Sequence, residues 1–149
     1  MGNLGCGCPG SMARVIERNE TSEQEAKGSI PSELRQWPVQ LHLVPPTAPY
    51  FQDADILVAA DCVAFAMGEM HRRLLKGKAL AIACPKLDET GNYVEKLAQI
   101  FQSVKSVTVA IMEVPCCRGL DVMVRQALEK SGRHIPLETV VIGIDGERR

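Results

Sequence analysis

The residues of this chain best suited to chemistry are its six cysteines. Four of them directly follow aliphatic runs, in the segments Ala60-Asp61-Cys62, Ala83-Cys84-Pro85 and Val114-Pro115-Cys116-Cys117. The other two, Cys6 and Cys8, lie in a glycine-rich stretch near the amino terminus. Soft thiolate sulfur selects iron–sulfur clusters and zinc over magnesium or calcium. The spacing therefore raises the question of which elements would bring these sulfurs together.

The elements that position the cysteines are predicted by a repeated change of hydrophobic pattern. Short, continuously apolar runs are typical of strands covered on both faces, and they occur at residues 41–44, 56–60, 79–83, 107–112 and 140–144. Apolar residues at helical spacing lie between them, at residues 63–74, 92–104 and 119–131. Strand–helix alternation predicts an α/β fold: an open, mainly parallel five-stranded sheet with flanking helices, a Rossmann-like or flavodoxin-like three-layer sandwich.

The domain boundaries follow from composition. Residues 1–38 are rich in glycine and polar side chains and show little apolar periodicity, so we expect a flexible arm and linker there. Residues 39–149 are expected to form the α/β domain. The first crossover, from Pro45 to Asp55, is short and contains three prolines, which predicts a loop or a single turn in place of a helix.

Parallel topology predicts that the strand-end cysteines converge. All carboxyl ends of parallel strands lie on one edge of the sheet, where such folds bind their ligands. We therefore expect a shared site with ligands from Cys62, Cys84, Cys116 and Cys117, and Cys8 is available to close it from the arm. Cys62 and Cys117 also precede predicted helices, whose amino termini favour the thiolate form.

Some features of this site stay open at the level of sequence. Cys116 and Cys117 are adjacent and cannot easily both point at one centre, so one of them is expected to be a packing residue, and the sequence does not select which. A buried cysteine also behaves as a small hydrophobic residue, which is the plainer interpretation of Cys84 alone. Asp61 and Asp88 flank the predicted site, and capping is the expected role of both.

Composition excludes several classes of function. The net charge of −1 and the small number of aromatic residues give no reason to expect a nucleic-acid partner. No run approaches the ~18 apolar residues of a membrane span, so we expect a cytoplasmic protein without a membrane partner. In that reducing compartment, metal binding or redox chemistry is a better explanation of six cysteines than a disulfide framework. No glycine-rich nucleotide-binding motif follows any predicted strand.

Several segments of the sequence resemble a known family. Residues 33–41, Ala59–Cys62, Cys84–Asp88, Glu113–Cys117 and Ile142–Gly146 resemble the carboxyl-terminal domain of ferredoxin-like four-iron four-sulfur binding proteins of anaerobic bacteria. The resemblance spans about residues 8 to 147 and does not include the amino-terminal ferredoxin module with which family members typically begin. It implies an iron–sulfur or electron-transfer setting and a ferredoxin or other redox protein as partner.

Three functions are consistent with these observations. The first is an iron–sulfur (4Fe-4S) or other thiolate-metal domain, with zinc as the alternative metal, that transfers electrons or senses the redox state without being an enzyme. The second is a thiol-based oxidoreductase that uses paired cysteines, with Cys117 as the activated thiol. The third is a structural docking domain for a ferredoxin partner, in which the cysteines are only packing residues. The sequence does not determine the oligomeric state.

Overall fold

The centre of the molecule is a parallel sheet of four strands. The computed structural model describes residues 9–18 and 28–149. The strands are β3 (Asp55–Ala60), β4 (Lys78–Ala83), β5 (Ser106–Met112) and β6 (Leu137–Ile142), in the order β4-β3-β5-β6. All three neighbouring pairs are parallel, as the continuously apolar runs predict. The α/β fold predicted from the sequence is confirmed.

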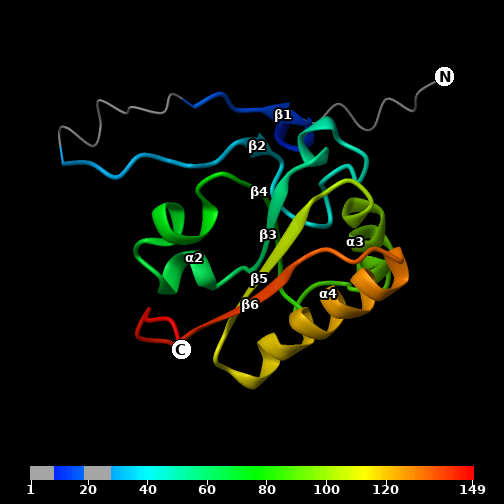
Figure 1. The fold of residues 1–149 in the computed structure, drawn as a ribbon. Helices are drawn as coiled ribbons and strands as arrows, with labels where there is room; N and C mark the ends of the chain where they lie inside the picture. Colours follow the sequence, from blue (N-terminus) through cyan, green and yellow to red (C-terminus); the bar gives the residue numbers. More distant parts are fainter. Residues whose placement is uncertain (1–8, 19–27) are drawn as a thin grey trace.

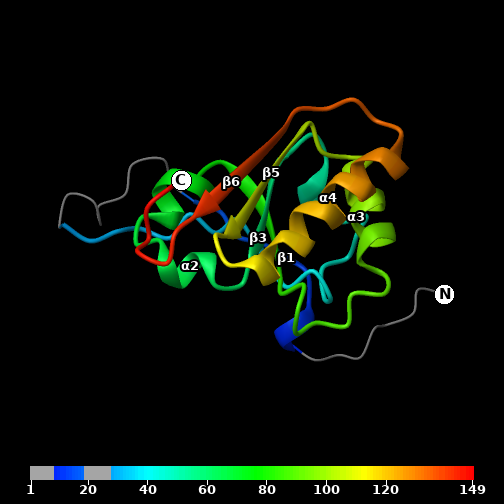
Figure 2. The same cartoon turned by 90° about the horizontal axis from the view of Figure 1, so that it is seen from below.

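Helices cover both faces of this sheet. Helices α3 (Tyr93–Phe101) and α4 (Arg118–Ser131) lie together on one side, and α2 (Val63–Ala66) lies on the other (Figures 1 and 2). The predicted helix over 63–74 is not continuous, because Met67 adopts an extended conformation and Gly68 follows it. A π-helical segment, η3 (His71–Leu75), completes this stretch. Met67, Met70 and Leu74 are nevertheless buried, so the periodicity correctly identified the core side chains.

The predicted first strand at residues 41–44 is a turn. Its amides at Leu43 and Val44 both donate to the carbonyl oxygen of Gln40, which closes the chain on itself. The chain meets the sheet just before this turn, where Gln40 bridges to Ile82 of β4 and the Leu41 amide donates to the Ile82 carbonyl oxygen. Leu41 and Val44 are fully buried all the same. Because burial alone does not distinguish a turn from a strand, the five-stranded prediction counted one strand too many. The crossover that follows contains a single 3-10 turn, η2 (Pro49–Phe51), as its prolines predict.

Part of the segment expected as an arm packs against the domain. A two-residue strand, β1 (Arg14–Val15), pairs antiparallel with β2 (Gln36–Trp37), and a 3-10 turn, η1 (Pro9–Ser11), precedes it. The side chain of Gln36 is buried and forms hydrogen bonds with both the amide (2.9 Å) and the carbonyl oxygen (2.8 Å) of Leu80 in β4. Residues before the predicted boundary at residue 38 are therefore packed against the α/β domain. Residues 1–8 and 19–27 of the expected arm lie outside the described residues.

Candidate thiol site at the carboxyl edge of the sheet

The strand order creates a switch point at the carboxyl edge. The chain leaves β3 for β4 on one side and then returns to β5 on the other side of β3. In open α/β sheets, ligands bind in the crevice outside the carboxyl ends of the strands, at such a reversal. Cys62 follows β3, and the turn η4 (Pro115–Cys117) follows β5. Two of the predicted cysteine segments therefore flank the switch point.

The structure brings the four strand-end cysteines to one edge. Ala60 and Ala83 are register partners at the ends of β3 and β4, so the chains that lead to Cys62 and Cys84 leave the sheet side by side. The charges of Cys116, Cys62 and Cys84 each raise the pKa of Cys117, after the larger effect of its burial. The ends of β3, β4 and β5 thus place all four cysteines at the carboxyl edge of the sheet.

The four thiols differ in exposure. Cys62 and Cys116 are exposed, Cys84 is intermediate, and Cys117 is only 7% exposed. The pKa of Cys117 is raised mainly by burial, although a hydrogen bond with the backbone of Met112 lowers it. Burial thus disfavours the thiolate form of Cys117, opposite to the activation expected from its place before α4. Of the two adjacent cysteines, Cys117 is the packing residue and Cys116 faces solvent.

The loop after β4 places polar groups beside Cys84. Asp88 Oδ2 accepts hydrogen bonds from the Cys84 amide at 3.0 Å and from the Tyr93 hydroxyl at 2.7 Å. Asp88 therefore does not cap a helix as expected: it binds the amide of Cys84 at the end of β4, and Asn92 precedes α3. The sequence did not predict Tyr93 as a residue of this site, because a tyrosine at the start of a helix is usually a core residue. Burial, followed by its bond to Asp88, raises the pKa of Tyr93, so its hydroxyl stays a donor.

Asp61 is a second carboxylate at this edge. Its pKa is raised mainly by burial and further by the charge of Asp88, whereas a hydrogen bond with Gln40 lowers it. Its Oδ1 atom is buried and finds no hydrogen-bond partner among the described residues. No capping contact of Asp61 with α2 is present there either, since Cys62 is the residue that precedes that helix. Asp61 is instead a poorly satisfied acid next to the thiols.

The donor set suits soft metals, but the described side chains are not arranged as a closed ligand set. Within residues 9–18 and 28–149, no three histidine, cysteine or acidic side chains stand together as ligands of a metal ion. Cys8, predicted as a further ligand, lies outside the described residues, as does Cys6. A metal centre at this edge would therefore require rotation of the exposed thiols or a ligand from beyond the described residues.

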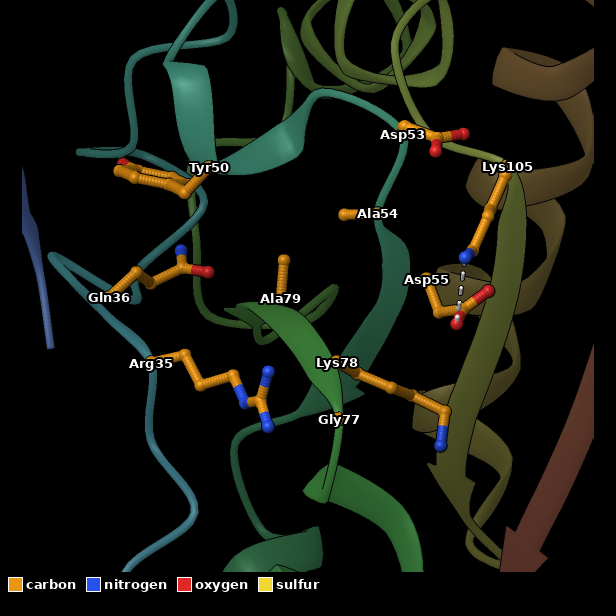
Figure 3. A pocket seen from close by; sticks show the side chains of 10 residues that line it. All are labelled: Arg35, Gln36, Tyr50, Asp53, Ala54, Asp55, Gly77, Lys78, Ala79 and Lys105. Carbon is orange, nitrogen blue, oxygen red and sulfur yellow. Dashed lines mark ion pairs between the residues drawn. The ribbon is translucent and has the colours of Figure 1, made fainter. Parts of the chain in front are cut away.

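A pocket lies at the opposite, amino-terminal edge of the sheet. It has a volume of about 230 Å³ and is lined by residues that include Arg35, Tyr50, Lys78 and Lys105 (Figure 3). Lys78 donates to the carbonyl oxygen of Leu74, and Lys105 lies 4.0 Å from a carboxylate oxygen of Asp55. Two of its three cations are thus engaged within the chain, and no cysteine lines it. We therefore place the candidate site at the thiol edge.

The fold and the position of this site define an α/β protein of the doubly wound type. A family model described as a Rossmann-like domain matches residues 48–148, and the chain belongs to this family. The chain is also 34% identical, over 115 residues, to an uncharacterized protein of Archaeoglobus fulgidus. That match covers 76% of this chain and 81% of the archaeal protein. No helix within the described parts of the chain has the length and apolar character needed to cross a membrane.

Proposed function

We propose that the carboxyl edge of the sheet is a thiolate site that binds an iron–sulfur cluster and serves electron transfer or redox sensing. The observation that carries this proposal is the position of Cys62, Cys84, Cys116 and Cys117 after three neighbouring parallel strands, at the same edge of the sheet as the switch point. Thiolates are the ligands that iron–sulfur clusters require, and zinc is the alternative metal. The resemblance of the segments around these cysteines to iron–sulfur binding proteins supports the same choice.

The chain's own residues have separate roles in this proposal. Cys62, Cys84 and Cys116 supply sulfur at the edge, with Cys8 as a further candidate ligand. Cys117 packs in the hydrophobic core and keeps its proton at neutral pH, since burial raises its pKa. When bound, the cluster would supply a one-electron acceptor.

Metal analysis tests this function directly. Protein purified without oxygen, or reconstituted with iron and sulfide, should contain both and absorb broadly in the visible range. Cys62→Ser and Cys84→Ser should each lose most of the iron, because hydroxyl replaces thiolate poorly on soft metals. Cys6→Ser is the matched control and should retain it. If the wild-type protein takes up neither iron nor zinc, and the serine variants fold like it, the metal site is refuted.

A second candidate function is favoured by the exposure of Cys62 and Cys116. In a thiol oxidoreductase, one of these thiolates would attack a disulfide of a partner protein, and a second cysteine would resolve the mixed disulfide. The partner would leave with two thiols, and this chain would keep one disulfide. The burial of Cys117 favours the exposed Cys62 or Cys116 as the attacking group. Oxidation would then remove two free thiols and leave the protein colourless, whereas loss of a cluster would bleach a coloured protein.

The surroundings of the thiols suit a protein partner. Phe65 is 92% exposed three residues after Cys62, and Leu87 is 82% exposed three residues after Cys84. Apolar side chains exposed near the thiols could be covered by a protein partner. We infer that a ferredoxin or other redox protein docks over this edge. The double variant Phe65→Ser, Leu87→Ser should slow electron exchange with a ferredoxin, whereas Val15→Ser, on exposed β1, should not.

A further inference from the structure

The loop from Cys84 to Asp88 is closed by two hydrogen bonds between its ends and one within it. The Asp88 amide donates to the Cys84 carbonyl oxygen at 3.0 Å, and the Cys84 amide donates to Asp88 Oδ2 at the same distance. Between them, the Leu87 amide donates to Cys84 Sγ at 3.4 Å. The backbone therefore turns around the sulfur and directs an N–H group at it. Such a donor stabilises sulfur that carries negative charge or binds a metal.

Tyr93 connects this loop to the hydrophobic core. Its side chain is only 1% exposed and lies at the first residue of α3, yet its hydroxyl reaches Asp88 Oδ2 at 2.7 Å. The same oxygen thus accepts from the Cys84 amide and from a rigidly packed side chain. A hydrogen bond to a carboxylate is among the stronger ones in proteins. The position of Asp88, and with it the closure of the loop, is set by α3.

The loop is also held from the side of α4. A Cβ atom added at Gly119 would lie 3.2 Å from Cβ of Pro85, so the residue after Cys84 packs directly on the first turn of α4. This turn follows Cys116 and Cys117. Contacts with α3 and α4 therefore hold Cys84 in place relative to the other thiols.

We infer that Asp88 and Tyr93 are positioning residues that act through the loop on Cys84 and make it the anchoring ligand of the thiol site. The inference rests on the proposed function for the identity of the ligand. The geometry of the loop can be measured without any metal. Tyr93 acts through Asp88, and Asp88 acts through the backbone amide of Cys84.

Tyr93→Phe tests this inference, with Tyr50→Phe as the matched control. Both changes remove one hydroxyl from a tyrosine, but the Tyr50 hydroxyl is buried without a hydrogen-bond partner among the described residues. In metal-free protein, Tyr93→Phe should increase the exchange rate of the Leu87 amide and the alkylation rate of Cys84 by about tenfold, the equivalent of one hydrogen bond to a charged group. Tyr50→Phe should change neither rate.

A second readout uses the loaded protein. In iron-reconstituted protein, loss of the bond from Tyr93 should shift the reduction potential and the visible spectrum, neither of which a purely structural hydroxyl would move. Asp88→Asn keeps an acceptor oxygen for the Cys84 amide but removes the charge, and it should give an intermediate effect. Unchanged Leu87 exchange and Cys84 alkylation in a folded Tyr93→Phe protein would overturn the inference. If the wild type binds no metal, the proposed function fails, while the metal-free rates still decide the positioning role.

Discussion

Single residues at the thiol edge are distinguished by burial more than by their place in the sequence. Cys116 and Cys117 are adjacent, yet one is exposed and the other packs in the core. Burial disfavours a thiolate, and a thiol without its charge is a poor nucleophile. The reactivity of the four cysteines should therefore follow their exposure.

Alkylation of the metal-free protein measures this order. With a small excess of iodoacetamide at neutral pH, Cys62 and Cys116 should be modified first and Cys117 last, because burial raises the pKa of Cys117 and shields its sulfur. Peptide mass spectrometry resolves the sites, and alkylation in urea, where all four thiols are equally accessible, is the control. Early modification of Cys117 would contradict its assignment as a packing residue.

Tyr50 offers a pH dependence that a single variant isolates. Burial raises its pKa from 10.0 to about 12, so the folded protein holds this proton more tightly than the unfolded chain does. The resulting stabilisation is complete below about pH 10 and is lost as the pH rises through about 12. The free energy of unfolding, measured with urea, should therefore fall more steeply over this pH range for the wild type than for Tyr50→Phe. Parallel pH profiles for the two proteins would show that the hydroxyl is not buried.

The ends of helices α4 and α2 are set by the backbone conformation of single residues. Helix α4 closes at Gly132, which adopts the left-handed conformation with φ of 71°, as its place after the last apolar residue predicts. Helix α2, by contrast, stops after four residues at Met67, and this early stop is not apparent in the apolar spacing. Element ends thus depend on local dihedral angles that hydrophobic periodicity does not encode.

A pair of glycine substitutions tests the closure of α4. Gly132→Ala should destabilise the protein by about 1 kcal/mol, since a Cβ atom is disfavoured at positive φ. Gly91→Ala is the control, because no atom lies within 4 Å of the added Cβ and Gly91 has no positive φ. Chemical denaturation gives both free energies of unfolding. Equal stability of the two variants would contradict a left-handed closure at Gly132.

At the scale of the whole molecule, the edges of the sheet are protected in different ways. The free edge of β4 is covered by the Gln36 side chain and by the bridge at Gln40. The opposite edge strand, β6, is partly covered by the carboxyl-terminal segment, in which Arg148 bridges to Ile142. Covering an edge satisfies backbone groups that would otherwise pair with another chain.

Gln36→Ala measures the contribution of this side-chain cover. Its loss leaves the amide and carbonyl of Leu80 without their partner in a buried place, which should cost about 2 to 3 kcal/mol of the free energy of unfolding. The control is Gln126→Ala on the exposed face of α4, which should be nearly neutral. Urea midpoints of the two variants provide the comparison. A neutral Gln36→Ala would mean that water replaces the side chain at this edge.

The sequence by itself determined the α/β class, the parallel sheet and the placement of cysteines after three strands, because continuous apolar runs and strand–helix alternation are local patterns with direct consequences for topology. It also located the buried side chains of residues 41–44 and 63–74, although not their conformation. Only the tertiary structure decided that Cys117 is buried, that Gln36 completes the edge of β4, and that Tyr93 fixes the loop of Cys84. These features join residues distant in sequence or depend on desolvation. Both arise only when separate elements pack together, so no local pattern encodes them.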